Sequence, residues 1–332
     1  MGFKEVNFIF NQDKKSVTEI AEKYSFKTKE VKSILNKSKN KRSFFMEDYT
    51  LNPYMGCSFN CSYCYVNGSK YADNTNSYVV KSNAYELLKS KLKNKVKKRE
   101  RAIINLGSAS EAYMEIEKDL FLTRDILKLL ARFRFPIHII TKSDLILRDR
   151  DILKKIQESA ILPKDIKVTD SDEESKLKVI ISFSFSTTDD KIAKIFEPKV
   201  PLPSKRLKAM KKLKKDGFCI GAALMPLLPF ISDSEESLRE IYSDFKNVGA
   251  EYAIPGSLSL FDEYGNGNIN SKKSYFDKVK EHFPEYYEDT TRIFEGKNYL
   301  SNNFHEDFTK KIRKISKEYN IKTAIKEEYN FI

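Results

Sequence analysis

The sequence predicts an α/β protein with a parallel sheet, and three observations support this fold class. Between residues 46 and 256, short apolar runs alternate with longer stretches whose apolar residues recur at helical spacing. Six such runs separated by helices are typical of a parallel sheet joined by right-handed crossovers. The chain has 332 residues, 40% of them hydrophobic, which is enough for one large core with appendages.

The expected elements follow one another with few interruptions. Strands are predicted at residues 49–54, 102–106, 137–141, 178–186, 218–225 and 252–255. Helices are predicted at residues 82–98, 120–133, 149–158, 204–216 and 234–247. A charged surface loop is expected at residues 163–176. In a parallel sheet of this kind, functional groups gather at the carboxyl ends of the strands.

Two segments flank this core of residues 46–256. Residues 1–45 are polar and basic, and apolar spacing over 17–23 and 28–35 predicts two short helices. This helical arm resembles a helix-turn-helix; the alternative is a packing arm, because a DNA-reading version needs a third helix. Residues 257–332 are predicted to form a mostly helical extension that covers an open side of a barrel.

The positive net charge of the chain favours acidic partners. The formal net charge is +13, concentrated in residues 89–101 and 205–215. Such a field attracts polyanions, including nucleic acids, but both runs also fit the solvated faces of helices. No apolar stretch of about 18 residues and no signal-peptide pattern is present, so we expect a cytoplasmic protein without membrane association.

Three of the four cysteines fall within eight residues, at Cys57, Cys61 and Cys64. Thiolates so clustered select an iron–sulfur cluster, Zn²⁺ or Cu(I), and three of them leave one iron of a cubane cluster open. A closed zinc site would need a fourth ligand, for which Cys219 is the alternative because the three histidines lie far away in sequence. A thioredoxin-like motif at Cys61 and Cys64 is a further alternative.

The cysteine spacing, with Tyr63 just before the last cysteine, resembles the signature of the radical SAM superfamily. Its flanks resemble the DNA repair photolyase-like branch related to spore photoproduct lyase, over about residues 33–295. These flanks are the run LNPYMG before Cys57 and the short motifs TR, TKS, RD, FEP and RL that begin at Thr123, Thr141, Arg148, Phe196 and Arg206.

The resemblance implies a partial (β/α)6 TIM-like barrel and an enzyme of lyase or oxidoreductase type. It implies a [4Fe-4S] cluster on Cys57, Cys61 and Cys64, with S-adenosyl-L-methionine bound to the open iron and cleaved to a 5'-deoxyadenosyl radical. It further implies an electron donor such as flavodoxin or ferredoxin, and nucleic acid is one substrate class, as in DNA repair. The alternatives are a radical SAM enzyme acting on a protein or metabolite, and a nucleic-acid-binding protein with a structural metal cluster.

The resemblance also suggests residues that bind S-adenosylmethionine, and Tyr63, just before the last cysteine, is one of them. Ser110 and Glu111, in the turn after the second strand, are expected to accept from its ammonium group, unless this is an ordinary strand-to-helix turn. Lys142, at the end of the third strand, is expected to pair with its carboxylate, unless it is a surface charge. Ser184 and Ser186 share one face of the fourth strand by alternation and are expected to bind ribose or carboxylate oxygens, unless the backbone satisfies them.

One feature of the lyase is expected to be missing. The resemblance implies a hydrogen-donating cysteine near the turn after the second strand, but residues 107–113 contain none. Cys219, early in the fifth predicted strand, is expected to be an inert buried side chain. We therefore expect this chain not to repair the spore photoproduct by the lyase's mechanism; Tyr65 or Tyr113 could donate hydrogen instead.

Overall fold

The computed structural model describes residues 17–39, 45–66, 78–262, 270–294 and 296–326. Its main element is a seven-stranded sheet in the order β10-β9-β8-β7-β6-β3-β2. The strands are β2 (Leu35–Lys37), β3 (Tyr49–Leu51), β6 (Ile104–Leu106), β7 (Ile137–Thr141), β8 (Val179–Ser184), β9 (Cys219–Leu224) and β10 (Tyr252–Pro255).

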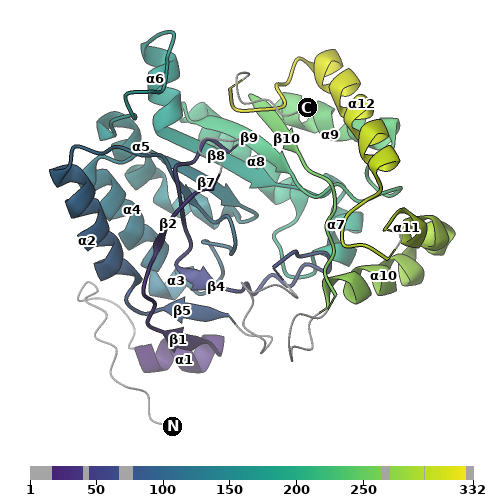
Figure 1. Cartoon of the computed structure of the whole chain (residues 1–332), viewed down its shortest axis with the longest axis horizontal. Helices are drawn as coiled ribbons and strands as arrows, with labels where there is room; N and C mark the ends of the chain where they lie inside the picture. The colour runs from purple at the N-terminus through teal and green to yellow at the C-terminus, as the bar shows by residue number, and fades with distance from the viewer. Residues whose placement is uncertain (1–16, 40–44, 67–77, 263–269, 295, 327–332) are drawn as a thin grey trace.

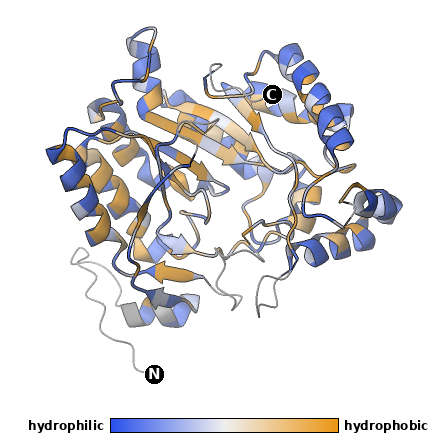
Figure 2. Ribbon diagram, viewed as in Figure 1, coloured by the Kyte–Doolittle hydropathy of each residue, from blue (hydrophilic) through white to orange (hydrophobic). Residues whose placement is uncertain are grey.

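The six strands from β3 to β10 are parallel, in the sequential order that the alternating pattern predicts. β8 and β9 are buried along their whole length, as is usual for parallel strands covered on both faces. Figure 2 shows their hydrophobic residues inside the molecule and the hydrophilic residues on the outer faces of the surrounding helices. The structure therefore has the α/β fold of a partial (β/α)6 barrel.

These strands are connected by helices, of which the longer ones lie on the outer side of the sheet (Figure 1). The connecting helices are α2 (Ala84–Lys97), α3 (Glu117–Leu120), α4 (Leu122–Phe133), α5 (Arg150–Ser159), α6 (Ser171–Lys178), α7 (Asp190–Phe196), α8 (Pro203–Lys215) and α9 (Glu235–Val248), with a 3-10 turn at Asp144–Asp149. The apolar face of α4 is buried against the core, as its helical spacing predicts. The chemistry of α9's ends explains its bounds, because Ser234 caps its first turn and Gly249 ends it with a positive φ of 77°.

The prediction of a second helix in the N-terminal arm, at residues 28–35, is wrong. α1 (Val17–Tyr24) is present, but the chain then forms β1 (Lys27–Lys29), which pairs with β5 (Val79–Lys81), and continues into β2. The side chain of Asn83 holds the segment extended, bonding both the N–H and the C=O of Val31 at 3.0 Å. Pairing to distant strands overrides local helical spacing here, so residues 17–39 contain no helix-turn-helix.

Two other expectations also differ from the structure. The first predicted strand is divided at Pro53 into β3 and β4 (Tyr54–Met55), and β4 belongs to the small sheet β1-β5-β4. The predicted loop at 163–176 is helical from Ser171 onward. Asp170 caps α6, and only Leu177 of this helix is buried, so the sequence has no apolar stripe to reveal it.

The C-terminal extension consists mainly of α10 (Ser271–His282), α11 (Tyr287–Phe294) and α12 (Asn302–Tyr319), with a 3-10 turn at Pro284–Tyr286. Two ion pairs join α12 to α9: Lys314 to Glu235 at 2.8 Å and Arg239 to Glu318 at 3.1 Å. Past α12, Lys322 pairs with Tyr252, so the extension covers the outer edge of β10. None of the helices in the described ranges is long and apolar enough to cross a bilayer.

Candidate functional site

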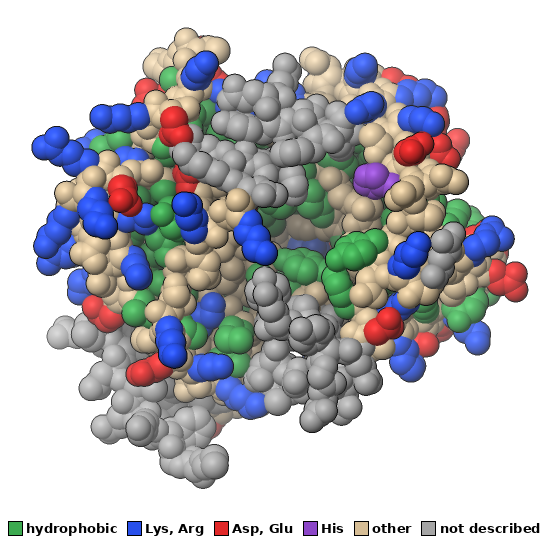
Figure 3. Space-filling model, viewed as in Figure 1, with side chains coloured by type: hydrophobic (Ala, Val, Ile, Leu, Met, Phe, Trp, Pro, Cys, Tyr) green, Lys and Arg blue, Asp and Glu red, His purple; other side chains and the backbone are tan. Residues whose placement is uncertain are grey.

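A cavity of about 360 Å³ opens at the carboxyl edge of the parallel strands. Its walls come from the segments that follow the six parallel strands, including residues 57–66, 107–111, 140–142, 184, 223–226 and 256–259. The wall is mainly apolar and includes Phe45, Phe59 and Met225. A hollow bordered by hydrophobic side chains is visible near the centre of the molecule in Figure 3. This is where a parallel sheet is expected to place its functional groups.

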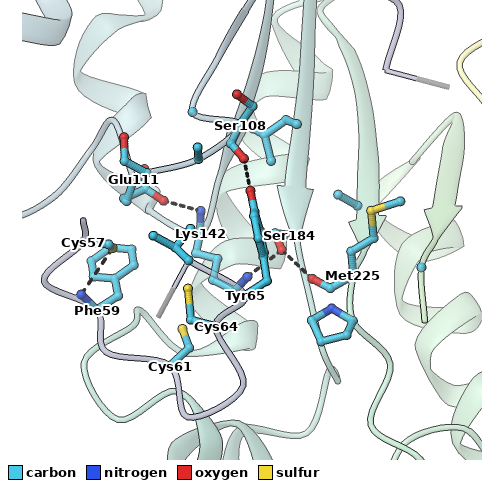
Figure 4. Close-up of a pocket in the computed structure, with 18 of the residues that line it drawn as sticks. Cys57, Phe59, Cys61, Cys64, Tyr65, Ser108, Glu111, Lys142, Ser184 and Met225 are labelled. Atoms are coloured by element: carbon cyan, nitrogen blue, oxygen red, sulfur yellow. Dashed lines mark hydrogen bonds between the residues drawn. The ribbon is translucent and has the colours of Figure 1, made fainter. Parts of the chain in front are cut away.

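The three clustered cysteines all line this cavity. Positive φ angles at Gly56 (71°) and Asn60 (51°) let the loop turn twice within a few residues. In Figure 4 the sulfurs of Cys61 and Cys64 lie below Lys142 and Ser184, while Cys57 stands to one side next to Phe59. The backbone N–H of Phe59 donates to the Cys57 sulfur at 3.4 Å, the kind of contact that tunes a sulfur ligand.

The donor set fits an iron–sulfur cluster. None of the three cysteines is in a disulfide, and Cys219 lies at the start of β9, at the opposite end of the sheet. Within the described ranges, no three His, Cys, Asp or Glu side chains converge on one point as ligands of a single ion do. A cubane does not require such convergence, because each thiolate binds a different iron.

Two of the three thiols, those of Cys57 and Cys61, have raised pKa values. Burial, with a contribution from the charge of Glu111, raises the pKa of Cys57 to about 12. Burial also raises the pKa of Cys61 well above its ordinary value. Ligation must therefore displace protons from these thiols, which makes cluster binding dependent on pH.

Lys142 and Ser184 lie together in the cavity wall, at the ends of adjacent strands. The Lys142 ammonium donates to Ser184 Oγ at 2.6 Å, and Ser184 donates in turn to the Met225 carbonyl at 3.2 Å. The ammonium also lies 5.8 Å from the centre of the Tyr63 ring. No carboxylate of the described residues pairs with Lys142, so this cation can meet an anionic group in the cavity.

The turn after β6 combines a fixed carboxylate with a free hydroxyl. Glu111 accepts from the Thr141 hydroxyl at 2.7 Å, the Tyr113 N–H at 2.8 Å and the Lys142 N–H at 2.9 Å. These bonds tie the turn to the end of β7 and leave about one acceptor position of the carboxylate open. The Ser110 hydroxyl is buried in the cavity wall without a partner. Such an unsatisfied group is a natural contact for a ligand ammonium.

Burial raises the pKa of Glu111, although the bonds from Lys142, Thr141 and Tyr113 oppose this effect. Gly107 begins the same turn with a φ of +93°. A Cβ at this position would lie 2.3 Å from the Ile140 carbonyl oxygen. Only glycine therefore lets the turn pack this closely against β7.

The structure does not bring Ser186 to the cavity. β8 ends at Ser184, so the side-chain alternation of a strand no longer applies two residues later. The Ser186 hydroxyl donates to Glu197 at 2.9 Å, and Ser186 is not among the residues that line the cavity. Tyr63 contributes its ring to the wall while its hydroxyl also donates to Glu197.

A buried ion pair that the sequence left without a role supports the cysteine loop. Arg206 donates to Glu197 at 2.5 Å and to the Ser184 carbonyl at 2.6 Å, and both side chains of the pair are fully buried. Burial acts to raise the pKa of Glu197, but Arg206, Lys142 and two hydroxyl donors outweigh it and hold the pKa below its ordinary value. The carboxylate stays charged and fixes Tyr63 between Cys61 and Cys64.

Sequence reasoning missed one further residue of the site, Asn52, and considered Tyr65 only as a possible hydrogen donor. The Asn52 side chain accepts from the Ala109 N–H at 3.0 Å and donates to Ser108 Oγ at 3.2 Å, while the Tyr65 hydroxyl donates to the Ser108 carbonyl. Asn52 directly follows β3, so its place at the carboxyl end of a strand was the available signal.

Comparisons with known proteins agree with this geometry. An uncharacterized protein of Methanocaldococcus jannaschii is 31% identical over 251 residues, which cover 70% of this chain and 84% of that protein. An uncharacterized protein of Mycobacterium tuberculosis is 28% identical over 226 residues, 66% of this chain and 61% of that protein.

Among solved structures, spore photoproduct lyase complexed with dinucleoside spore photoproduct superimposes with a TM-score of 0.56 and 13% identity. The match covers 94% of this chain and 85% of that one, and at this identity it shows a shared fold alone. The sequence profile of the radical SAM superfamily matches residues 51–241, more than half of the chain. Since this match includes the cysteine loop and the four parallel strands from β6 to β9, the chain belongs to the radical SAM superfamily.

Proposed function

We propose that this protein holds a [4Fe-4S] cluster on Cys57, Cys61 and Cys64 and uses it to cleave S-adenosylmethionine reductively. One observation carries the proposal: the three cysteines, none of them in a disulfide, share a cavity with the unpaired cation of Lys142 and the unpartnered hydroxyl of Ser110. A methionyl group carries one carboxylate and one ammonium, so it needs a cation and an acceptor near the cluster.

Each residue contributes a separate task. When bound, the cluster supplies an electron that breaks the sulfonium C–S bond and yields methionine and a 5'-deoxyadenosyl radical. Lys142, held by Ser184, pairs with the carboxylate. Ser110 and the open acceptor position of Glu111 receive the ammonium group. The apolar wall keeps water away from the radical.

A nucleic-acid substrate is supported by the net charge of +13 and by the lyase-like fold, but not by the C-terminal parts of the two basic runs. Lys95 bonds the Tyr49 hydroxyl at the start of β3, and Lys214 pairs with Glu251 just before β10. These contacts place the C-terminal ends of α2 and α8 at the amino edge of the sheet, opposite the cavity. Lysines there also complement the helix dipoles, which favours the solvated-face interpretation.

A protein or metabolite substrate is the second candidate, and the mainly apolar cavity wall favours it. The spore photoproduct itself is not expected, because Cys57, Cys61 and Cys64 are the only cysteines lining the cavity among the described residues. All three are assigned to the cluster, so none is left to donate hydrogen.

Two measurements test these choices. Anaerobically reconstituted protein, given dithionite and S-adenosylmethionine, should form 5'-deoxyadenosine, whereas a nucleic-acid-binding protein with a structural cluster or zinc would form none. Anisotropy titration with DNA and RNA should show binding that falls steeply with salt if nucleic acid is the substrate. A lack of association even at about 50 mM salt would instead favour a protein or metabolite.

A further inference from the structure

A second cavity, of about 690 Å³, shares one lining residue with the cavity that contains the three cysteines. The shared residue is Phe59, which lines both cavities and is itself only 7% exposed. The other walls come from the segments after β6, β7 and β8, so the second cavity also lies at the carboxyl edge of the sheet.

Phe59 connects the second cavity to a cluster ligand. Its backbone N–H donates to the Cys57 sulfur at 3.4 Å, and the residue lines both cavities. A packed aromatic side chain is a steric barrier to molecules but not to electron transfer. A molecule in the second cavity would therefore be separated from S-adenosylmethionine and yet lie one residue from a cysteine ligand.

The rim of the second cavity carries an excess of free positive charge. Lys199 and Lys205 are exposed, and neither has a carboxylate partner among the described residues. The other two cations on the rim are neutralised, since Lys118 pairs with Glu115 at 3.1 Å and Arg148 pairs with buried carboxylates. Asp144 is then the one lining carboxylate outside these pairs.

We propose that this rim, which we call the Lys199/Lys205 surface, docks an acidic one-electron transfer protein such as a flavodoxin. The proposal rests on the proposed function, because only an enzyme that reduces its cluster needs such a donor. Electron-transfer contacts are small and steered by charge, so two free lysines beside a conducting residue suit a brief encounter. The donor gives one electron to the cluster through Phe59, and no atom is transferred.

The test compares Lys199→Glu/Lys205→Glu with a matched control, Lys91→Glu/Lys93→Glu, on the exposed face of α2. Both changes alter the net charge equally. Stopped-flow bleaching of the cluster by photoreduced flavodoxin should slow about tenfold in the first variant at low salt, and the difference should shrink as salt screens the charges. Dithionite-driven formation of 5'-deoxyadenosine should be the same in all three proteins.

Binding of oxidised flavodoxin, followed by its flavin fluorescence, gives a readout that is independent of activity. It should weaken in the first variant and not in the control. Equal slowing in both variants, or none in either, would overturn the docking proposal; so would loss of DNA or RNA binding without loss of flavodoxin binding. Absence of dithionite-driven activity in the unaltered protein would instead count against the proposed function, leaving the binding result to decide the docking surface.

Discussion

The ammonium of Lys142 lies 2.6 Å from Ser184 Oγ, across the ends of the neighbouring strands β7 and β8. The bond holds a cation in the wall of the cavity that also receives the three cysteines. Because Ser184 donates in turn to the Met225 carbonyl, the Lys142 side chain has one preferred direction. The cation is therefore in place before any ligand arrives.

Lys142→Met should weaken S-adenosylmethionine binding about ten- to a hundredfold, the value of one hydrogen bond to a charged group. Ser184→Ala should weaken it less, since the cation remains but loses its support. Equilibrium binding to reconstituted protein measures both effects, with iron content as the check on the cluster. Lys128→Met, on the outer face of α4, is the matched control. Unchanged affinity in both site variants would show that neither residue meets the cofactor.

Replacing Cys57, Cys61 or Cys64 with Ala should abolish the brown colour and reduce the iron content of anaerobically reconstituted protein. Each contributes one thiolate from a single loop, and no described histidine lies beside them to substitute. Cys219→Ala should retain the cluster, because Cys219 is buried at the amino end of β9. Loss of iron in the Cys219 variant, or recovery of zinc alone from the unaltered protein, would refute the assignment.

Gly107→Ala should lower both stability and cofactor affinity. The added Cβ would meet the Ile140 carbonyl at 2.3 Å, and the backbone there has a φ that L-residues avoid. Gly217→Ala measures the cost of the unfavourable φ alone, because Gly217 has a similar φ of +85° but nothing within 4 Å of an added Cβ. Urea unfolding should show a loss of about 1–2 kcal/mol for Gly217→Ala and a larger loss for Gly107→Ala. Equal losses would mean that the turn does not need its close approach to β7.

His138 should make the fold sensitive to acid. Its Nδ1–H donates to the Phe45 carbonyl at 2.7 Å and its Nε2 accepts from Ser182 at 2.8 Å, so the neutral ring is fully bonded. Burial lowers the pKa of His138 to about 4 from an ordinary value of 6.5. Between these values the unfolded chain binds a proton that the folded chain does not, so stability falls as pH falls through this window.

The expected loss across that window is at most about 3 kcal/mol, from 1.36 kcal/mol per pKa unit. Urea unfolding of the unaltered protein and of His138→Gln, at pH values from 7 to 4, measures the difference between their slopes. His282→Gln, at a partly exposed position on α10, should keep the slope of the unaltered protein. Parallel slopes for His138→Gln and the unaltered protein would contradict the assignment.

Much of this architecture could be predicted because it repeats. The alternation of buried strands and amphipathic helices gave the order of all six parallel strands, and the cysteine spacing identified one loop as the site. What failed depended on contacts far away in sequence. The segment after α1 is extended because Asn83 and β5 hold it, which no local pattern around Val31 reveals.

The differences at the site have two separate causes. Ser186 was placed by strand alternation, but β8 ends at Ser184 and the Ser186 hydroxyl bonds Glu197 instead. The Glu197–Arg206 pair joins a loop to a helix, so its partnership could not be derived from spacing. Lys142 and Ser184 were located correctly at the cavity, since both lie at strand ends where the register is well defined.

Formation of 5'-deoxyadenosine is the most direct test of the central claim. Protein reconstituted anaerobically with iron and sulfide is incubated with dithionite and S-adenosylmethionine, and the products are separated and quantified. We predict 5'-deoxyadenosine and methionine in equal amounts from the unaltered protein and from Cys219→Ala, and neither product from Cys57→Ala. Reconstituted protein that carries a full cluster and binds S-adenosylmethionine, yet forms no 5'-deoxyadenosine, would contradict the proposal.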